Sequence, residues 1–117
     1  MNKIEKEIEY KGYRGCIKLI GNKYTQHRCA YVIIPKENPL YEKDFNELSL
    51  DVHGGVNYSE YGEDFKRKTE GELEALKDDD WILGIDFGHG GDEGWTLEQV
   101  EEELKHFINE VIRVGKE

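Results

Sequence analysis

Apolar and polar residues alternate along the first third of the chain, which is the pattern of half-buried β-strands. Residues 13–20 and 27–34 follow it, and residues 4–10 favour a strand although their pattern also allows a helical turn. The turns expected between them fall at Lys11-Gly12 and at Gly21-Asn22-Lys23. Pro35 ends the third segment, because proline has no backbone N–H to give to a sheet. This part of the chain therefore predicts antiparallel strands joined by short turns.

Further along, the pattern predicts two more strands and less regular connections. Leu48–His53 and Trp81–Phe87 have the length and apolar content of strands, and the second is apolar enough to lie in the interior of the sheet. Residues 35–47 contain both prolines and indicate a loop with one helical turn. Residues 61–80 are charged and poorly periodic, and E-G-E-L-E-A-L-K within them favours a short helix.

The C-terminal segment gives the clearest helical pattern. Thr96 and Gln99 match a capping box, and Gly115 is a natural end point. An apolar stripe at three- and four-residue spacing follows the cap: Leu97, Val100, Leu104, Phe107, Ile108, Val111 and Ile112. The fold class predicted is α+β, a mostly antiparallel sheet of five or six strands with a C-terminal amphipathic helix packed on one face.

The size and charge of the chain exclude some classes of protein. The 117 residues suit a single α+β domain spanning 1–117. A net charge of −10 opposes binding to a nucleic acid polymer. No apolar run approaches the roughly 18 residues of a membrane span, and the N-terminus lacks a signal-like stretch. Cys16 and Cys29 lie in strand-like contexts, so buried free thiols and a cytoplasmic location are expected.

The tripeptide His-Gly-Gly occurs twice, beginning at His53 and at His89. The second copy lies between a predicted strand and a helix N-terminus, an arrangement that binds anions through free N–H groups. A phosphate-bearing, nucleotide-like ligand is therefore expected at the two loops, with Tyr58 as the preferred stacking residue. A simple turn is the alternative. The expected ligand-binding residues are His53, Gly54, Gly55, Tyr58, Gly88, His89, Gly90, Gly91 and Trp95.

Four titratable residues accompany these loops: His53, Asp86, His89 and Asp92. If the loops meet at one end of the sheet, their imidazoles and carboxylates could hold a divalent metal such as Zn²⁺, Mn²⁺ or Fe²⁺. Without a metal, His53, Asp86 and His89 could act as general acid and base. A purely structural role for each histidine is the other interpretation. The sequence does not choose which lysine or arginine meets the phosphate, nor whether two copies of the chain share a site.

Several other motifs are excluded. Asp86-Phe87-Gly88 matches a kinase signature, but the remaining kinase motifs are missing. Serine hydrolase chemistry is excluded because no G-x-S-x-G is present. His27 and Cys29 offer two metal ligands, but no other residue is expected to complete that set.

Three segments together resemble a family of small bacteriophage proteins. They are C-A-Y-V-I-I-P-K-E-N-P-L-Y (29–41), D-V-H-G-G-V-N-Y (51–58) and W-I-L-G-I-D-F-G-H-G-G-D (81–92). The resemblance implies a phage origin and a place in the host cytoplasm, and it assigns no activity. By analogy with other small phage proteins, we expect a counter-defence protein that sequesters a nucleotide-like immune signal of the cyclic nucleotide or ADP-ribose type. A metal-dependent phosphodiesterase and an acidic protein-interaction inhibitor are the alternatives.

Overall fold

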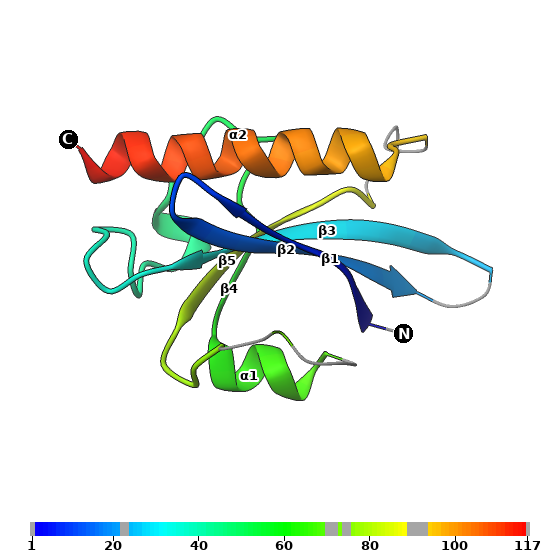
Figure 1. Ribbon diagram of the computed structural model, residues 1–117, viewed down its shortest axis with the longest axis horizontal. Helices are drawn as coiled ribbons and strands as arrows, with labels where there is room; N and C mark the ends of the chain where they lie inside the picture. Colours follow the sequence, from blue (N-terminus) through cyan, green and yellow to red (C-terminus); the bar gives the residue numbers. More distant parts are fainter. Residues whose placement is uncertain (1, 22–23, 70–72, 74–75, 89–93, 117) are drawn as a thin grey trace.

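The protein forms one antiparallel sheet with a long helix on one face (Figure 1). The structure is a computed structural model that describes residues 2–21, 24–69, 73, 76–88 and 94–116. The strands are β1 (Asn2–Tyr10), β2 (Tyr13–Gly21), β3 (Gln26–Ile34), β4 (Tyr58–Tyr61) and β5 (Trp81–Asp86). The helices are η1 (Phe45–Glu47), α1 (Gly62–Arg67) and α2 (Leu97–Gly115). The predicted α+β class and antiparallel sheet are confirmed.

The sheet order is β1-β2-β3-β5-β4, and every neighbouring pair is antiparallel. The first three strands form a meander. Lys11 (φ 53°) and Gly12 (φ 82°) make the turn between β1 and β2, and left-handed residues at both turn positions match the twist of a two-residue hairpin. β5 enters between β3 and β4, so its predicted interior position is also confirmed.

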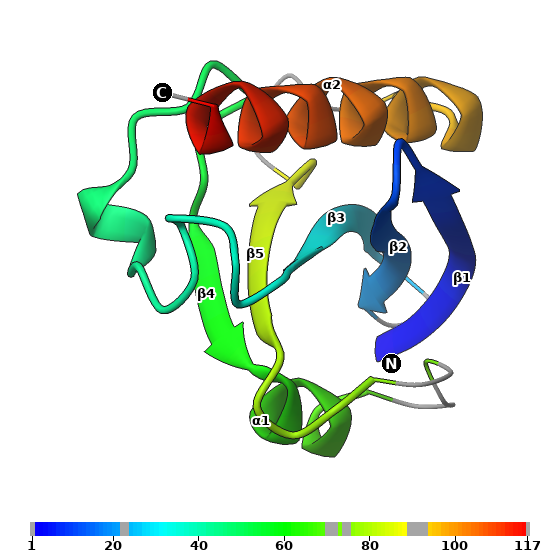
Figure 2. The ribbon, with the colours of Figure 1, turned by 60° about the vertical axis from the view of Figure 1, so that its left-hand side comes forward.

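Helix α2 covers one face of the sheet (Figures 1 and 2). The Thr96 side chain accepts a hydrogen bond from the Gln99 N–H, and the Gln99 side chain accepts one from the Thr96 N–H. The predicted capping box is therefore present. The apolar stripe of α2 is buried against side chains from β2, β3 and β5, and its fully enclosed members are Val100, Leu104, Phe107, Ile108 and Val111.

Removing this cap should weaken the fold measurably. Thr96→Ala deletes the oxygen that satisfies a free N–H in the first helical turn, and such losses cost about 1 kcal/mol. For a chain of this size, we expect a fall in melting temperature of about 4 °C. Thr96→Ser keeps the hydroxyl and serves as the control, so equal destabilisation of both variants in thermal unfolding would contradict the capping explanation.

The opposite face of the sheet carries a second, smaller core beneath α1. Because side chains alternate along a strand, His27, Cys29 and Tyr31 of β3 lie on this face, whereas Ala30 and Val32 point to α2. The buried members of the second cluster are Cys16, Cys29, Tyr31, Ile33, Phe65, Leu76 and Ile82. Both cysteines are buried and unpaired with one another, as the sequence predicted.

The prediction of a strand at Leu48–His53 is wrong. This segment has no ladder partner within the described chain and runs beside α2, whose side chains take over its backbone hydrogen bonds. The Asp51 N–H donates to Glu110 Oε1 at 3.1 Å, and the His53 N–H donates to Glu103 Oε2 at 2.9 Å. His106 Nε2 lies 2.7 Å from the Asp51 carbonyl oxygen. These contacts satisfy polar backbone groups that a strand would otherwise pair.

The short helix expected within residues 70–77 was also misplaced. The helix in this region is α1, at Gly62–Arg67, and Leu73, Leu76 and Lys77 are not helical. Residues 70–72, 74 and 75 lie outside the described part of the chain. Among the helices that the structure describes, none combines the length and apolar character needed to cross a bilayer.

Candidate functional site

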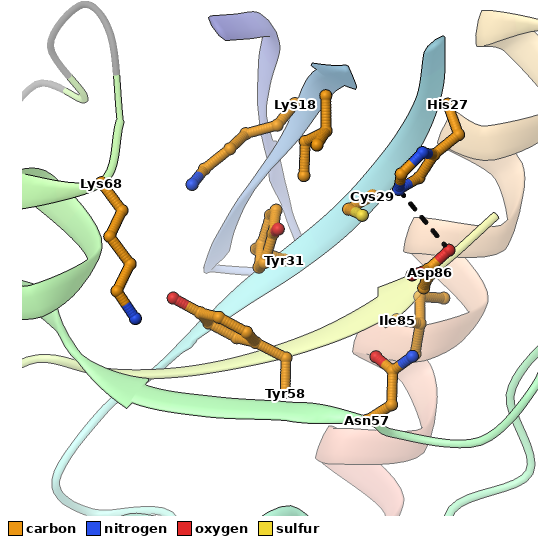
Figure 3. Close-up of a pocket in the computed structure, with 10 residues that line it drawn as sticks. Lys18, His27, Cys29, Tyr31, Asn57, Tyr58, Lys68, Ile85 and Asp86 are labelled. Carbon is orange, nitrogen blue, oxygen red and sulfur yellow. Dashed lines mark ion pairs between the residues drawn. The ribbon is translucent and has the colours of Figure 1, made fainter. Parts of the chain in front are cut away.

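A pocket of about 250 Å³ opens on the sheet face opposite α2 (Figure 3). Its walls come from β2, β3, β4 and β5, together with residues next to β4 and α1. The lining residues are Lys18, Ile20, His27, Cys29, Tyr31, Asn57, Tyr58, Lys68, Ile85 and Asp86. Tyr58 and Asp86 belong to the set predicted from the sequence. Lys18 is one of the basic residues among which the sequence did not choose a phosphate partner, and the remaining lining residues were not predicted as ligand contacts.

Lys18 is the most unusual residue of the pocket, because its side chain is only 2% exposed. Its ammonium nitrogen lies 3.9 Å from the centroid of the Phe65 ring and 5.1 Å from that of Tyr31. Within the described part of the chain, this ammonium has no hydrogen-bond or ion-pair partner. Burial lowers the pKa of Lys18 below its usual 10.5, which indicates that the fold disfavours this cation.

Two tyrosines form the aromatic wall beside Lys18. The Tyr31 and Tyr58 rings meet edge to face with centroids 5.2 Å apart. Gly84 makes room for them, since a Cβ at that position would lie 2.7 Å from a Tyr31 ring carbon. Burial raises the pKa of both phenols, most strongly at Tyr31, so both are neutral hydrogen-bonding groups at physiological pH.

Glu60 links the residues on the Lys68 side of the pocket. Its carboxylate accepts hydrogen bonds from the Tyr58 hydroxyl and from the Lys68 ammonium. Lys68 is more than half exposed, whereas Glu60 is only 16% exposed. The pocket therefore has a second ammonium group, held by a carboxylate, and Figure 3 shows the Lys18 and Lys68 side chains reaching toward the same space.

The opposite end of the pocket holds His27, Cys29 and Asp86 (Figure 3). One ligand atom from each lies within 4.8 Å of the others, and His27 Nε2 is 3.9 Å from Asp86 Oδ1. Cys29 and Asp86 are register partners on β3 and β5, and His27 lies on the same face as Cys29. The expectation that no residue completes a ligand set with His27 and Cys29 is therefore wrong, because Asp86 does.

The absence of a side chain at Gly88 allows the residues of this cluster to lie close together. A Cβ on Gly88 would lie 2.7 Å from two atoms of the His27 ring and 2.9 Å from Asp86 Oδ1, so glycine is what lets the three groups approach. The Gly88 N–H also donates to Asp86 Oδ1. Burial raises the pKa of the Cys29 thiol to about 11, which argues against a role for Cys29 as a free nucleophile at neutral pH.

The residues of the first His-Gly-Gly lie outside this pocket. The His53 ring stacks on Phe87 with centroids 5.0 Å apart and tilts against Trp95 at 4.7 Å. Phe87 belongs to the core under α2, whereas Asp86 faces the pocket on the other side of the sheet. Gly54 (φ 69°) and Gly55 (φ 77°) form a left-handed turn. Asp86 thus meets His27 and Cys29, and His53 packs with aromatic residues.

Four predicted site residues, His89, Gly90, Gly91 and Asp92, lie outside the described residues. The proposed meeting of the two His-Gly-Gly loops, and a metal held by His53, Asp86, His89 and Asp92, therefore stay predictions. Gly88 is described, and it contacts the cluster rather than the pocket's tyrosines.

One sequence signal could have found the pocket. His27, Cys29 and Tyr31 lie at every second position of the strand predicted at residues 27–34, which places all three on one face. Lys18 is a charged residue within the apolar strand β2, and its side chain lies on the sheet face that carries the pocket.

No protein-family model, curated protein or solved structure matches the chain. The resemblance to phage proteins therefore rests on sequence motifs and stays a prediction.

Proposed function

We propose that this protein binds a small nucleotide-like ligand, an anionic group joined to a ring, in the pocket between Lys18 and Asp86. The buried Lys18 ammonium carries the proposal. Lys18 is only 2% exposed and its ammonium has no hydrogen-bond or ion-pair partner among the described residues, so an anionic ligand would supply a direct partner. Lys68, on the same side, would add a second positive contact.

The other end of the pocket suits a ring that carries polar groups. Asp86 can accept hydrogen bonds, and the Asn57 side chain can both donate and accept them. Tyr58 contributes an aromatic wall between the two ends. Phosphate at the lysines and a base or sugar edge at Asp86 and Asn57 would therefore match the charges of the pocket.

The size of the pocket limits the ligand. About 250 Å³ is slightly below the roughly 300–1,000 Å³ of common small-molecule sites. A single phosphorylated nucleoside would be held more completely than a cyclic dinucleotide, half of which would extend past the pocket. Sequestration of a host immune signal would be the biological role, in keeping with the phage resemblance.

Cleavage of the ligand is the second candidate function. Its support is the cluster of His27, Cys29 and Asp86 at the other end of the same pocket, since imidazole and carboxylate groups beside a bound ligand can transfer protons. Chromatography after incubation separates the two functions: intact ligand recovered from heat-denatured protein supports sequestration, and new products support an enzyme.

Calorimetric titration with AMP, cyclic ADP-ribose isomers and cyclic dinucleotides tests the binding proposal. We expect at least one to bind, and we expect Lys68→Met to weaken its binding about fivefold to tenfold through loss of one charged contact. Lys105→Met on α2, at the opposite face, is the matched control and should bind normally. Undiminished binding by Lys68→Met together with loss in His53→Ala would place the ligand at the first His-Gly-Gly loop and reject the pocket.

A further inference from the structure

We propose that His27, Cys29 and Asp86 form a transition-metal site that prefers Zn²⁺, with three protein ligands and a fourth position directed into the pocket. The site differs from the set His53, Asp86, His89 and Asp92 expected from the sequence, with which it shares only Asp86. Its test does not depend on the proposed nucleotide binding, because zinc is titrated without nucleotide and the site shares only Asp86 with the residues proposed to contact that ligand.

The distances within the cluster fit tetrahedral coordination. Zinc bonds of about 2.0–2.3 Å place neighbouring ligand atoms roughly 3.3–3.8 Å apart. The three ligand atoms already lie within 4.8 Å of one another, and His27 Nε2 is 3.9 Å from Asp86 Oδ1. Shifts of about 1 Å or less, within reach of side-chain rotation, would bring all three onto one ion.

The chemistry of the donors selects the metal class. Imidazole nitrogen, thiolate sulfur and carboxylate oxygen together suit Zn²⁺, and a thiolate disfavours the hard cations Mg²⁺ and Ca²⁺. Zinc would displace the proton from the Cys29 thiol on binding. The resulting site would have the three-ligand form of catalytic zinc sites, since the fourth position faces the pocket and not a fourth side chain among the described residues.

The surroundings hold these donors in place. Cys29 and Asp86 are paired across two hydrogen-bonded strands, a more rigid support than a loop. The Gly88 N–H donates to Asp86 Oδ1 and so orients this carboxylate, and a hydrogen bond joins the Tyr31 hydroxyl to the Cys29 sulfur. Such outer contacts orient the ligands of metal sites. Gly88 completes the arrangement by leaving room for the His27 ring.

Titration of metal-stripped full-length protein with Zn²⁺ and with Co²⁺ tests the proposal. We expect one ion per chain, and for Co²⁺ a thiolate-to-metal charge-transfer absorption together with the d–d bands of a tetrahedral ion. Cys29→Ser and His27→Gln should each reduce zinc affinity by at least about 100-fold, beyond what loss of a supporting contact causes. Asp86→Asn should reduce it at least about tenfold.

Matched controls separate this site from others. Cys16→Ser removes the other buried thiol and should bind one zinc with wild-type affinity. Circular dichroism verifies folding, and His27 and Asp86, each about one-third exposed, provide variants that fold even if Cys29→Ser does not. The proposal is overturned if wild-type protein binds no stoichiometric zinc, if the Co²⁺ complex lacks thiolate absorption, or if His53→Ala loses the metal while His27→Gln keeps it.

Discussion

Lys18→Met should make the protein more stable and weaken ligand binding. Methionine keeps the length of the buried stem and makes favourable sulfur contacts with aromatic rings such as those of Phe65 and Tyr31. It also removes a cation that the fold disfavours, as the lowered pKa of Lys18 indicates. We expect a gain of about 1 kcal/mol, or roughly 4 °C in melting temperature, and at least a tenfold loss of affinity for the anionic ligand.

The gain should depend on pH in a defined direction. Because the pKa of Lys18 is lowered in the folded state, the unfolded chain binds the proton more tightly, and wild-type stability rises as pH increases from the folded-state pKa to about 10.5. The advantage of Lys18→Met is thus full below the folded-state pKa of Lys18 and shrinks as pH rises from that pKa to about 10.5. Cys16 and Cys29, whose raised pKa values destabilise the fold above about pH 9, also interact with Lys18, so the difference between the two curves reports Lys18 most directly below about pH 9.

Urea unfolding of both proteins from pH 7 to pH 10.5 provides the measurement. The groups that act on the Lys18 charge are Cys16, Cys29, Glu60 and Lys68, and the substitution leaves all four in place. A destabilised Lys18→Met at pH 7, or one that binds ligand normally, would mean that the lysine serves packing and that the pocket does not recognise anions.

Gly84→Ala should cause the largest loss of stability among single-methyl additions in the pocket wall. The new Cβ would lie 2.7 and 2.8 Å from two Tyr31 ring carbons and 3.2 Å from the Tyr58 Cβ. Tyr31 is 4% exposed and has little space to move. Overpacking of this kind costs about 3 kcal/mol, equivalent to a fall of about 10 °C for a chain of this size.

A double-mutant cycle identifies the cause. In a Tyr31→Ala background the clashing ring is absent, so Gly84→Ala should cost less than about 1 kcal/mol. Gly55→Ala is the matched control: its Cβ would meet no atom within 4 Å, and its φ of 77° limits the cost to about 1–2 kcal/mol. Equal losses from Gly84→Ala with and without Tyr31 would show that the ring contact is not responsible.

The parts of the fold that the sequence predicted correctly are those determined by neighbouring residues. Lys11 and Gly12 set the first hairpin, and Thr96 with Gln99 starts α2. The segment at residues 48–53 depends instead on Glu103, Glu110 and His106, fifty or more residues further along the chain. The periodicity of six residues contains no information about such distant hydrogen bonds. An apolar segment of strand length was therefore interpreted as a strand.

The candidate site required information of the same long-range kind. Asp86 was identified early, but its partners follow from the register that sets Cys29 opposite Asp86. More than fifty residues separate those two positions. Reasoning from neighbouring residues grouped Asp86 with His89 of the same loop and with His53 of the other His-Gly-Gly. Alternation of side chains in β3 and β5 instead places Asp86 beside His27. Phe87, the next residue after Asp86, lies on the opposite face of the sheet and stacks on His53.

The order of strands in the sheet has a consequence for synthesis of the chain. β4 leaves the ribosome before β5, yet Tyr58 pairs with Gly84, so β4 must wait for β5 to enter beside β3. The β1–β3 meander can form earlier from consecutive hairpins. Tyr31 is therefore placed on a nascent sheet, while Tyr58 joins it only after residue 84 has emerged. A ligand held by both sides of the pocket can consequently stabilise the completed chain but cannot assist the first half of its folding.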